Sequence, residues 1–353
     1  MTASKRAEMA GFCAANALMI RQYERYLREA EGLADSTIEN NLRAIANYEK
    51  FTGHADFKTF NTDVATAYKR HLMKKGGRRA AEQSSRATVR SKLGYVERFF
   101  RWLSDKPTYK SRIDVSDTRF FRLSNRDIAL TRGRTIKDAA TVDQLRHVIM
   151  TMPSETAIEK RNRALVACAL LTGARVNALI TLKLKHVRPD NLGINQEAED
   201  VHTKFAKTIP TAFFPVGDDI RDIFLDYVAF LKTELHFGNN DPLFPHTRKE
   251  VGEDRMFHWV GLTREHWDTP QPVRDIFRAA FAAAGIPYFS PHRVRNTLVQ
   301  LGQEICEDTA DFKAWSQNLG HEDILTTLSS YGHLPERQQF SRIQRLGEKR
   351  PNV

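Results

Sequence analysis

Two groups of basic residues in the second half of the sequence are suited to holding an anion. Arg175 ends the turn TGAR, which follows a predicted buried helix, so a rigid element would hold its guanidinium. His292 and Arg295 lie three residues apart at the start of another predicted helix. They would share one face there, where free N–H groups favour a phosphate. Each group alone is a weak indication, because arginines at helix ends usually cap carbonyl groups and H-x-x-R pairs usually lie on surfaces.

A third group consists of a histidine and a tyrosine in one stretch of the sequence. His321 follows a glycine in the sequence LGHEDILTT, and Tyr331 follows the short helix that this sequence predicts. A tyrosine near a helix end is usually half-buried packing. Beside two arginines and two histidines, it completes what phosphoryl transfer requires, namely cationic groups around the phosphate oxygens and a nucleophile. A tyrosine with a pKa of about 10 is a weak nucleophile unless the phosphate is already held beside it.

Such a site would need no cofactor and no metal ion, because the arginines and histidines supply the charge stabilisation. A covalent link to tyrosine also stores the energy of the phosphodiester, so resealing would need no ATP. The histidines His292, His321 and His333 leave a metallohydrolase as an alternative. Neither an HExxH sequence nor suitably spaced carboxylates accompany them, which argues against that alternative.

The positive charge of the chain is concentrated in one segment. The formal net charge is +11, and residues 58–110 hold 14 Lys or Arg against 4 Asp or Glu, a net charge of +10 (14 − 4). A basic field of this kind suits double-stranded DNA, because phosphate contacts release condensed counterions. A solvated basic helical face explains the composition equally well.

The first hundred residues predict a bundle of four amphipathic helices. They are expected at about 16–29, from a capping box at 36–39, from Thr62 to the glycine pair at 76–77, and after Ser85. The last helix would carry basic residues on its outer face, namely Arg86, Arg90, Lys92, Arg98 and Arg101. Between residues 106 and 134 the periodicity fails, which predicts a linker with a short hairpin and a domain boundary.

The second domain is predicted to be mostly helical with a small antiparallel sheet. A capping box at 141–144 opens it, and the apolar run at 164–171 predicts a helix that is buried on all sides. Short strands are expected between residues 192 and 216. Further helices are expected near Asp218, near Val273 and at Ser290-Pro291, where serine and proline form a strong helix start.

Length and composition exclude several classes of protein. A chain of 353 residues exceeds the usual limit of one core, so two domains are expected. No apolar run reaches the length of a membrane span, and the first twenty residues are too polar for a secretory signal. The three cysteines lie far apart without CxxC spacing, which fits a reducing cytoplasm and argues against a zinc site.

The order of the chemical groups along the chain resembles the tyrosine recombinases of the phage integrase family. ATVDQLRHVI resembles the opening of the family's catalytic domain, and TGARVNALITLKLKHV resembles its first arginine motif. PHRVRNTLV and LGHEDILTTLSSYGH resemble the second and third motifs. The resemblance covers almost the whole chain. It implies a helical, SAM-like core-binding domain at 1–105, a linker at 106–134, and an integrase-type catalytic domain with a C-terminal tail at 135–353.

The resemblance also implies a function and partners. The chain would be a cytoplasmic site-specific recombinase that cleaves and rejoins double-stranded DNA through a 3′-phosphotyrosine, in the integration or excision of a mobile element. It would act as a homo-oligomer on DNA, in a tetrameric synapse. One alternative is a type IB topoisomerase-like or resolvase-like enzyme, against which the tail after the tyrosine argues. The other is an inactive DNA-binding regulator, against which the complete set of site residues argues.

The family's motifs assign a role to each candidate residue. Arg175 and Arg295 would clamp the scissile phosphate, because a guanidinium fork suits that task better than an ammonium group. In the family, the histidine at the position of His292 assists proton transfer, and the one at the position of His321 holds a phosphate oxygen. Tyr331 would be the nucleophile.

The family also has a catalytic lysine on a turn of its small sheet, which protonates the leaving 5′-hydroxyl. The candidates in this sequence are Lys204 and Lys207, and Lys204 is preferred because it matches the first lysine of the family's β-turn pattern. The sequence departs from the family in two places, and the first is near Arg175. Ala178 stands where many members have an acidic residue that supports the first arginine, so either another carboxylate orients Arg175 or packing alone holds it.

The C-terminal part departs in its spacing. The interval from His321 to Tyr331 is one residue longer than in the commonest members, and one extra helical residue rotates a side chain by about 100°. The chain is therefore expected to leave regular helix before the tyrosine. Beyond it, Phe340, Ile343 and Leu346 form a narrow apolar stripe. The stripe either folds back on its own domain or docks on a neighbouring protomer, and the resemblance favours docking.

Overall fold

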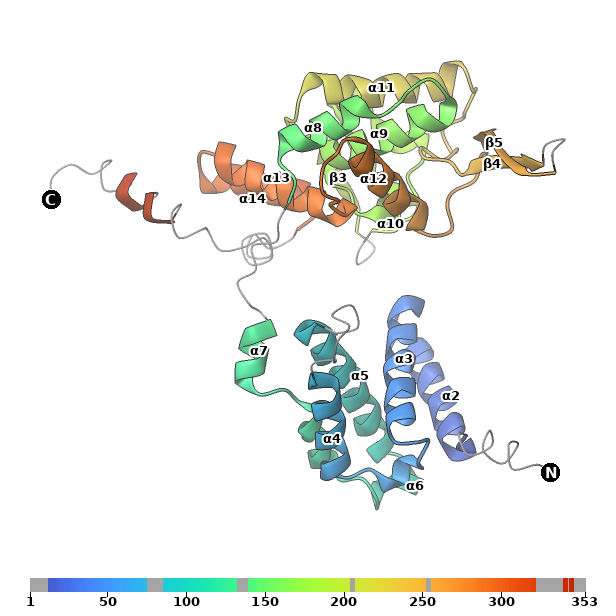
Figure 1. Ribbon diagram of the computed structural model, residues 1–353, viewed down its shortest axis with the longest axis vertical. Coiled ribbons are helices and arrows are strands. Elements are labelled where there is room, and N and C mark those ends of the chain that lie inside the picture. Colours follow the sequence, from blue (N-terminus) through green and yellow to red (C-terminus); the bar gives the residue numbers. More distant parts are fainter. Residues whose placement is uncertain are drawn as a thin grey trace. The chain divides into compact units, whose positions relative to one another are not determined.

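The computed structural model describes residues 12–74, 85–131, 139–203, 207–251, 255–321, 339–341 and 343–345. The chain forms two compact units, Met1–Gly133 and Arg134–Val353, and each contains its own hydrophobic core. Both units are mainly helical, and the second also holds small antiparallel sheets (Figure 1). The predicted fold class is confirmed.

The first unit is a helical bundle with an aromatic core. Its helices are α2 (Ala14–Glu29), α3 (Asp35–Phe51), α4 (Thr62–Met73), α5 (Arg86–Ser104), α6 (Pro107–Lys110) and α7 (Asn125–Thr131), with 3₁₀ segments at Phe57–Thr59 and Val115–Phe121. The Ser85 hydroxyl accepts a hydrogen bond from the N–H of Thr88 and so begins α5 as predicted. On the outer face of α5, Arg86, Arg90, Arg98 and Arg101 are exposed.

The start of α3 differs from its prediction. The helix begins at Asp35, with Ala34 as the N-cap and no capping side chain, so the predicted capping box at 36–39 does not form. An extended Ala34 already directs the chain into the helix one residue before the serine. The Ser-x-x-Glu pattern therefore lies inside the first turn, where the serine is not at the capping position.

The predicted linker at 106–134 is also wrong for most of its length. This segment contains α6, a 3₁₀ segment and α7. Tyr109, Ile113 and Phe121 within it are buried in the core of the first unit. Short helical turns and the residues between them contribute these side chains singly, so they produce no helical period for sequence analysis to detect.

In the second unit, helices pack around the buried helix α9. Its helices are α8 (Val142–Thr151), α9 (Ala157–Thr172), α10 (Val176–Leu179), α11 (Asp218–Thr233), α12 (Gln271–Ala283), α13 (Pro291–Ile305) and α14 (Thr309–Asn318), with 3₁₀ turns at Leu184–His186 and Pro189–Asn191. Helices α8, α11, α12 and α13 all contact α9 (Figure 1). Residues 164–171 of α9 are all buried, and the capping box at 141–144 is formed, as predicted.

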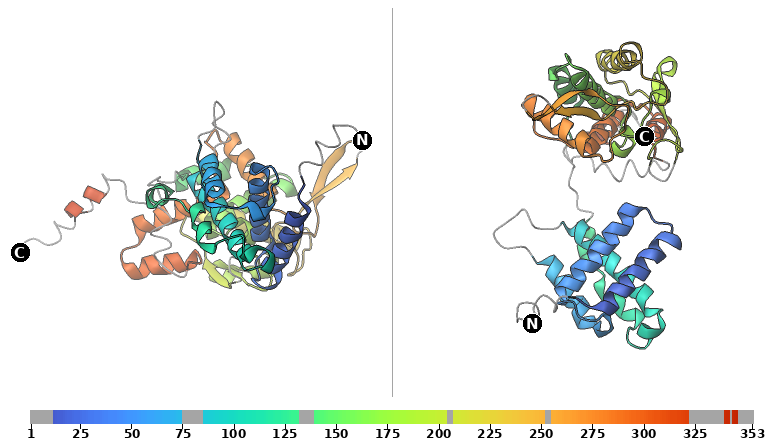
Figure 2. Two further views of the ribbon diagram at one scale, coloured as in Figure 1. Left: turned by 90° about the horizontal axis from the view of Figure 1, so that it is seen from below. Right: turned by 90° about the vertical axis from the view of Figure 1, so that its right-hand side faces the viewer.

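The larger sheet has three antiparallel strands in the order β1-β2-β3. They are β1 (Val187–Arg188), β2 (Gly193–Gln196) and β3 (Ile209–Ala212), and β2 and β3 lie in the region where strands are predicted. A second pair, β4 (Thr247–Val251) and β5 (Phe257–Leu262), projects beyond the helices of this unit (Figures 1 and 2). The sequence does not predict this hairpin, because β4 is exposed on both faces and so shows no apolar alternation.

Within the described parts of the chain, every helix is too short or too polar to cross a membrane.

Candidate active site

Arg295 lies near the start of α13 and is almost wholly buried. The helix begins where predicted, with Ser290 at the N-cap and Pro291 in the first turn, although the serine side chain makes no capping bond. Arg295 is 2% exposed, whereas His292 on the preceding turn is exposed. The arginine side chain thus lies inside the protein, whereas the histidine three residues earlier lies at its surface.

The Arg295 guanidinium joins the three motifs that the sequence predicts. It donates hydrogen bonds to the carbonyl of Gly173, in the first motif, and to the carbonyl of Leu319 at 2.6 Å, in the third. Its Nη2 also lies 3.0 Å from His321 Nε2. An arginine has no acceptor, so His321 Nε2 accepts this bond and is unprotonated. Arg295 Nε has no hydrogen-bond partner among the residues that the structure describes.

Two glycines allow the motifs to approach this closely. Gly173 ends α9 with φ +58°, and a Cβ atom there would lie 2.7 Å from Leu319 Cδ2. Gly320 has φ +71°, and a Cβ atom there would lie 2.7 Å from Ile209 Cδ1 on β3. Both positions have a left-handed backbone, and a Cβ atom at either would force a neighbouring side chain to shift. The glycines thus bring the turn at 319–321 against the end of α9 and against β3.

Arg175 lies two residues after Gly173, as the N-cap of the short helix α10, and is half-buried. The turn before it is fixed, because the Thr172 hydroxyl bonds to the Cys168 carbonyl at 2.6 Å and accepts from the N–H of Ala174. Ala178 is 1% exposed within the core. The position where family members carry a supporting acid is therefore filled by apolar packing, and a carboxylate there would be buried.

The predicted nucleophile and the preferred lysine, Tyr331 and Lys204, lie outside the described residues. The structure does describe Thr203 and Lys207, which flank residues 204–206 and are called the neck of the lysine loop. The Thr203 hydroxyl donates to the Lys207 carbonyl at 2.7 Å and accepts from its N–H at 2.9 Å. This pair of hydrogen bonds joins the two described residues that flank 204–206, within the loop between β2 and β3.

Asn318 is a site-supporting residue that the sequence analysis missed. Its side chain pairs with both backbone groups of Ala212 on β3, accepting from the N–H at 2.7 Å and donating to the carbonyl at 2.9 Å. The end of α14, just before His321, is thereby attached to the strand that follows the lysine loop. An asparagine at a helix end is common and gave no signal of this contact.

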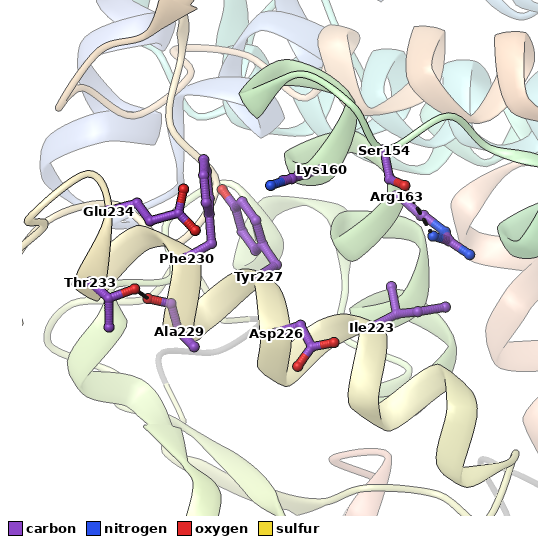
Figure 3. Close-up of a pocket in the computed structure, with 10 residues that line it drawn as sticks. All are labelled: Ser154, Lys160, Arg163, Ile223, Asp226, Tyr227, Ala229, Phe230, Thr233 and Glu234. Atoms are coloured by element: carbon purple, nitrogen blue, oxygen red, sulfur yellow. Dashed lines mark hydrogen bonds between the residues drawn. The ribbon is translucent and has the colours of Figure 1, made fainter.

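A pocket of about 390 Å³ lies elsewhere in the second unit, between the start of α9 and α11 (Figure 3). Lys160 and Arg163 line it together with Asp226 and Glu234. Two positive and two negative charges give it no preference for a phosphate, and none of its described lining residues is a predicted site residue. The arginine cluster, rather than this pocket, is the candidate active site.

Comparisons with known proteins agree with this architecture. Residues 139–337 match the phage integrase family, and residues 20–107 match its N-terminal SAM-like domain. The chain therefore belongs to the phage integrase family of tyrosine recombinases, which are DNA breaking-rejoining enzymes. The resemblance read from the motifs is confirmed.

Individual relatives are distant but cover most of the chain. Tyrosine recombinase XerD of Oceanobacillus iheyensis is 23% identical over 317 residues, which is 87% of this chain and 91% of the relative. A lambda integrase dimer bound to a COC′ core site has a TM-score of 0.61 and 16% identity, covering 89% of this chain and 94% of its own. A lambda integrase tetramer bound to a Holliday junction has a TM-score of 0.60 and 17% identity, with 94% and 81% covered. These two structures share the fold.

Proposed function

We propose that this chain is a site-specific DNA recombinase in which Tyr331 attacks a phosphate held by Arg175, Arg295, His292 and His321. The observation that carries the proposal is the position of Arg295, whose guanidinium contacts the first and third motifs at once. Three segments far apart in the sequence thus converge on one cation. A structural arginine would need only the carbonyl contacts, whereas here a histidine lies in the same cluster, together with an Nε that has no partner among the described residues.

The proposed cleavage step balances without a metal ion. Tyr331 Oη forms a bond to phosphorus while the bond from phosphorus to the 5′-oxygen breaks. The phenol proton passes to His292, and Lys204 gives a proton to the leaving oxygen. Arg175 and Arg295 stabilise the charge on the non-bridging oxygens. Rejoining is the same step in reverse, with a 5′-hydroxyl as the nucleophile.

We further propose that the first unit is the core-binding domain and the second the catalytic domain. The exposed arginines of α5 support the first assignment, and the arginine cluster supports the second. We place the reaction in the cytoplasm, in the integration or excision of mobile DNA, as the resemblance to phage integrases implies. Cloning the junctions of excised circles from the host genome would test that physiological role.

The central experiment uses a nicked suicide DNA substrate that traps the covalent intermediate. Wild-type protein is expected to form a 3′-phosphotyrosine adduct at Tyr331, in excess EDTA and without nucleotide, because side chains supply the charge stabilisation. Peptide mapping of the adduct identifies the residue. Tyr331→Phe should bind the same DNA and form no adduct. Loss of the wild-type adduct in EDTA, with recovery on adding a divalent ion, would exclude this mechanism.

The first unit is expected to bind DNA largely through phosphates. Replacing both Arg90 and Arg101 by alanine should lower the slope of log affinity against log salt by about 0.9 for each phosphate that the variant no longer neutralises. Fluorescence anisotropy over a salt series measures the slope. Arg25→Ala is the control, because Arg25 is an exposed arginine on α2 outside the basic segment. An unchanged slope in the double variant would indicate that the basic residues form a solvated helical face and do not contact DNA.

We propose that the protein works as a homo-oligomer on double-stranded DNA, in a tetrameric synapse joined by the tail. Phe340 and Ile343 are 61% and 64% exposed on their short helix. A mostly apolar groove of about 420 Å³ is lined by residues that include Phe214 and Trp315. Burying the tail stripe in this groove of a second copy would remove both apolar surfaces from water.

A chain truncated after Leu334 should therefore still bind single sites but fail to form a synaptic complex. Native gel shifts with a two-site DNA measure this difference. Replacing Phe340 and Ile343 together by serine should have the same effect, and Gln344→Ser, on the same exposed helix, should have none. Normal synapsis by the truncated chain would exclude the proposed role of the tail in assembly.

A further inference from the structure

A cluster of charged side chains lies at the base of the loop between β2 and β3. Lys183 Nζ pairs with one carboxylate oxygen of Asp200, and Lys185 Nζ lies 2.6 Å from the other. The hydrogen bonds from Lys183 and Lys185 hold the pKa of Asp200 well below its ordinary value. The side chains of Lys183 and Asp200 are mostly shielded from solvent, at 24% and 20% exposure, so salt screens their attraction less than that of a surface pair.

His186 completes the cluster and determines its chemistry. Its side chain is fully buried, and Nδ1 accepts a hydrogen bond from the Lys183 N–H at 2.9 Å. The ring proton must therefore be on Nε2, which faces Asp200 Oδ2 at 3.4 Å and Glu197 Oε2 at 3.9 Å.

The spacing of His186, Glu197 and Asp200 would admit a metal ion. A metal at Nε2 would need the lone pair that this tautomer uses to hold a proton. The two lysine ammonium groups on Asp200 also repel a cation. The cluster is thus an ion-pair network rather than a metal site.

The network connects two parts of the proposed active site. Lys183 and Lys185 belong to the motif that contains Arg175, and Asp200 precedes Lys204 by four residues. Beyond Asp200, Val201 is buried in the core and the N–H of His202 donates to the Thr181 hydroxyl at 2.9 Å. The first half of the lysine loop is therefore attached to the segment that follows Arg175.

We propose that Asp200 is a positioning residue for proton transfer to the leaving group. Its two ion pairs hold the lysine-bearing loop against the Arg175 segment, so that the lysine reaches the 5′-oxygen of the phosphate that Arg175 clamps. This inference rests on the proposed function. A displacement of about 1 Å in such a group can lower a rate by about a hundredfold, because proton transfer requires hydrogen-bond distance.

The test compares two DNA substrates with one variant. Asp200→Asn keeps the shape of the side chain and removes its charge. On an ordinary suicide substrate it should cleave about ten- to a hundredfold more slowly than wild type. On a substrate with a 5′-bridging phosphorothiolate, the sulfur leaves without needing a proton, so the variant should cleave within about threefold of wild type. DNA affinity, measured by anisotropy, should not change.

A matched control is available in α11. Asp219 pairs with Arg146 at 2.9 Å and is 31% exposed, so Asp219→Asn also removes a half-buried ion pair of the second unit. It should cleave both substrates at wild-type rate. If Asp200→Asn does not fold, Lys185→Gln removes one of the two pairs and should show a smaller defect with the same substrate selectivity.

An Asp200→Asn defect that is equal on the two substrates, or no defect at all, would overturn the inference. Lys204→Ala and Lys207→Ala, run in the same assay, separate this inference from the proposed function. If the phosphorothiolate rescues one lysine variant but not Asp200→Asn, only the positioning role is wrong. If it rescues neither lysine variant, the assignment of the general acid fails, and the positioning role fails with it.

Discussion

Replacing Arg295 by alanine should slow DNA cleavage by at least a factor of about 100, and Arg175→Ala should have an effect of similar size. Both variants should still bind their DNA site, because the first unit is proposed to supply most phosphate contacts. Cleavage slows because each guanidinium is proposed to stabilise charge that develops on the phosphate in the transition state. Single-turnover cleavage of a suicide substrate, with anisotropy for binding, separates the two effects.

Arg295→Ala should have a second effect, which is a loss of stability. The buried carbonyls of Gly173 and Leu319 would lose their donor. Each unsatisfied acceptor costs about 1–3 kcal/mol, so the melting temperature should fall as well. Arg295→Lys should not restore cleavage, because an ammonium group cannot serve three acceptors in a plane.

Arg163→Ala is the control for loss of an arginine that bonds to the backbone. Arg163 donates to the Ile149 carbonyl at 2.9 Å and lines the pocket between α9 and α11, away from the proposed active site. Its loss should therefore affect stability but leave cleavage at wild-type rate. Near wild-type cleavage by Arg175→Ala or Arg295→Ala would show that the arginine is misassigned.

Lys204→Ala should slow cleavage of ordinary DNA by about 10²- to 10⁴-fold, the usual contribution of a general acid. A 5′-bridging phosphorothiolate should restore most of that rate, because a thiolate leaves without a proton. Lys207→Ala should have a smaller effect and little rescue. The backbone of Lys207 bonds to the Thr203 hydroxyl, so this residue closes the neck of the loop whatever its side chain does.

The opposite pattern of rescue would reverse the assignment of the general acid. Rescue of Lys207→Ala without rescue of Lys204→Ala would move the general acid to the second lysine. Thr203→Val provides a control for the loop itself. It removes both hydrogen bonds between Thr203 and Lys207, and it replaces neither lysine. Its defect should also be relieved by the phosphorothiolate, and a defect equal on both substrates would indicate a general loss of structure.

Local patterns in the sequence predict much of the fold. The capping box at 141–144, the buried run at 164–171 and the start of α13 at Pro291 all agree with the structure. Each depends on residues within a few positions of one another, so their periods and caps are visible in the chain itself. Where short turns bury single residues, as at Tyr109 and Phe121, no period exists and the prediction fails.

The amino-acid sequence by itself determined which chemical groups this protein has, in which order, and which family it resembles. Only the tertiary structure decided which of those groups meet. Arg295 reaches the carbonyl of Gly173 across 122 residues, and Asn318 reaches Ala212 across 106. The periodicity of side chains along the sequence predicts only which residues one helical turn apart are neighbours. The contacts of Arg295 and Asn318 depend instead on how whole helices and strands pack. For that reason the burial of Arg295 and the ion pairs of Asp200 emerged only from the structure.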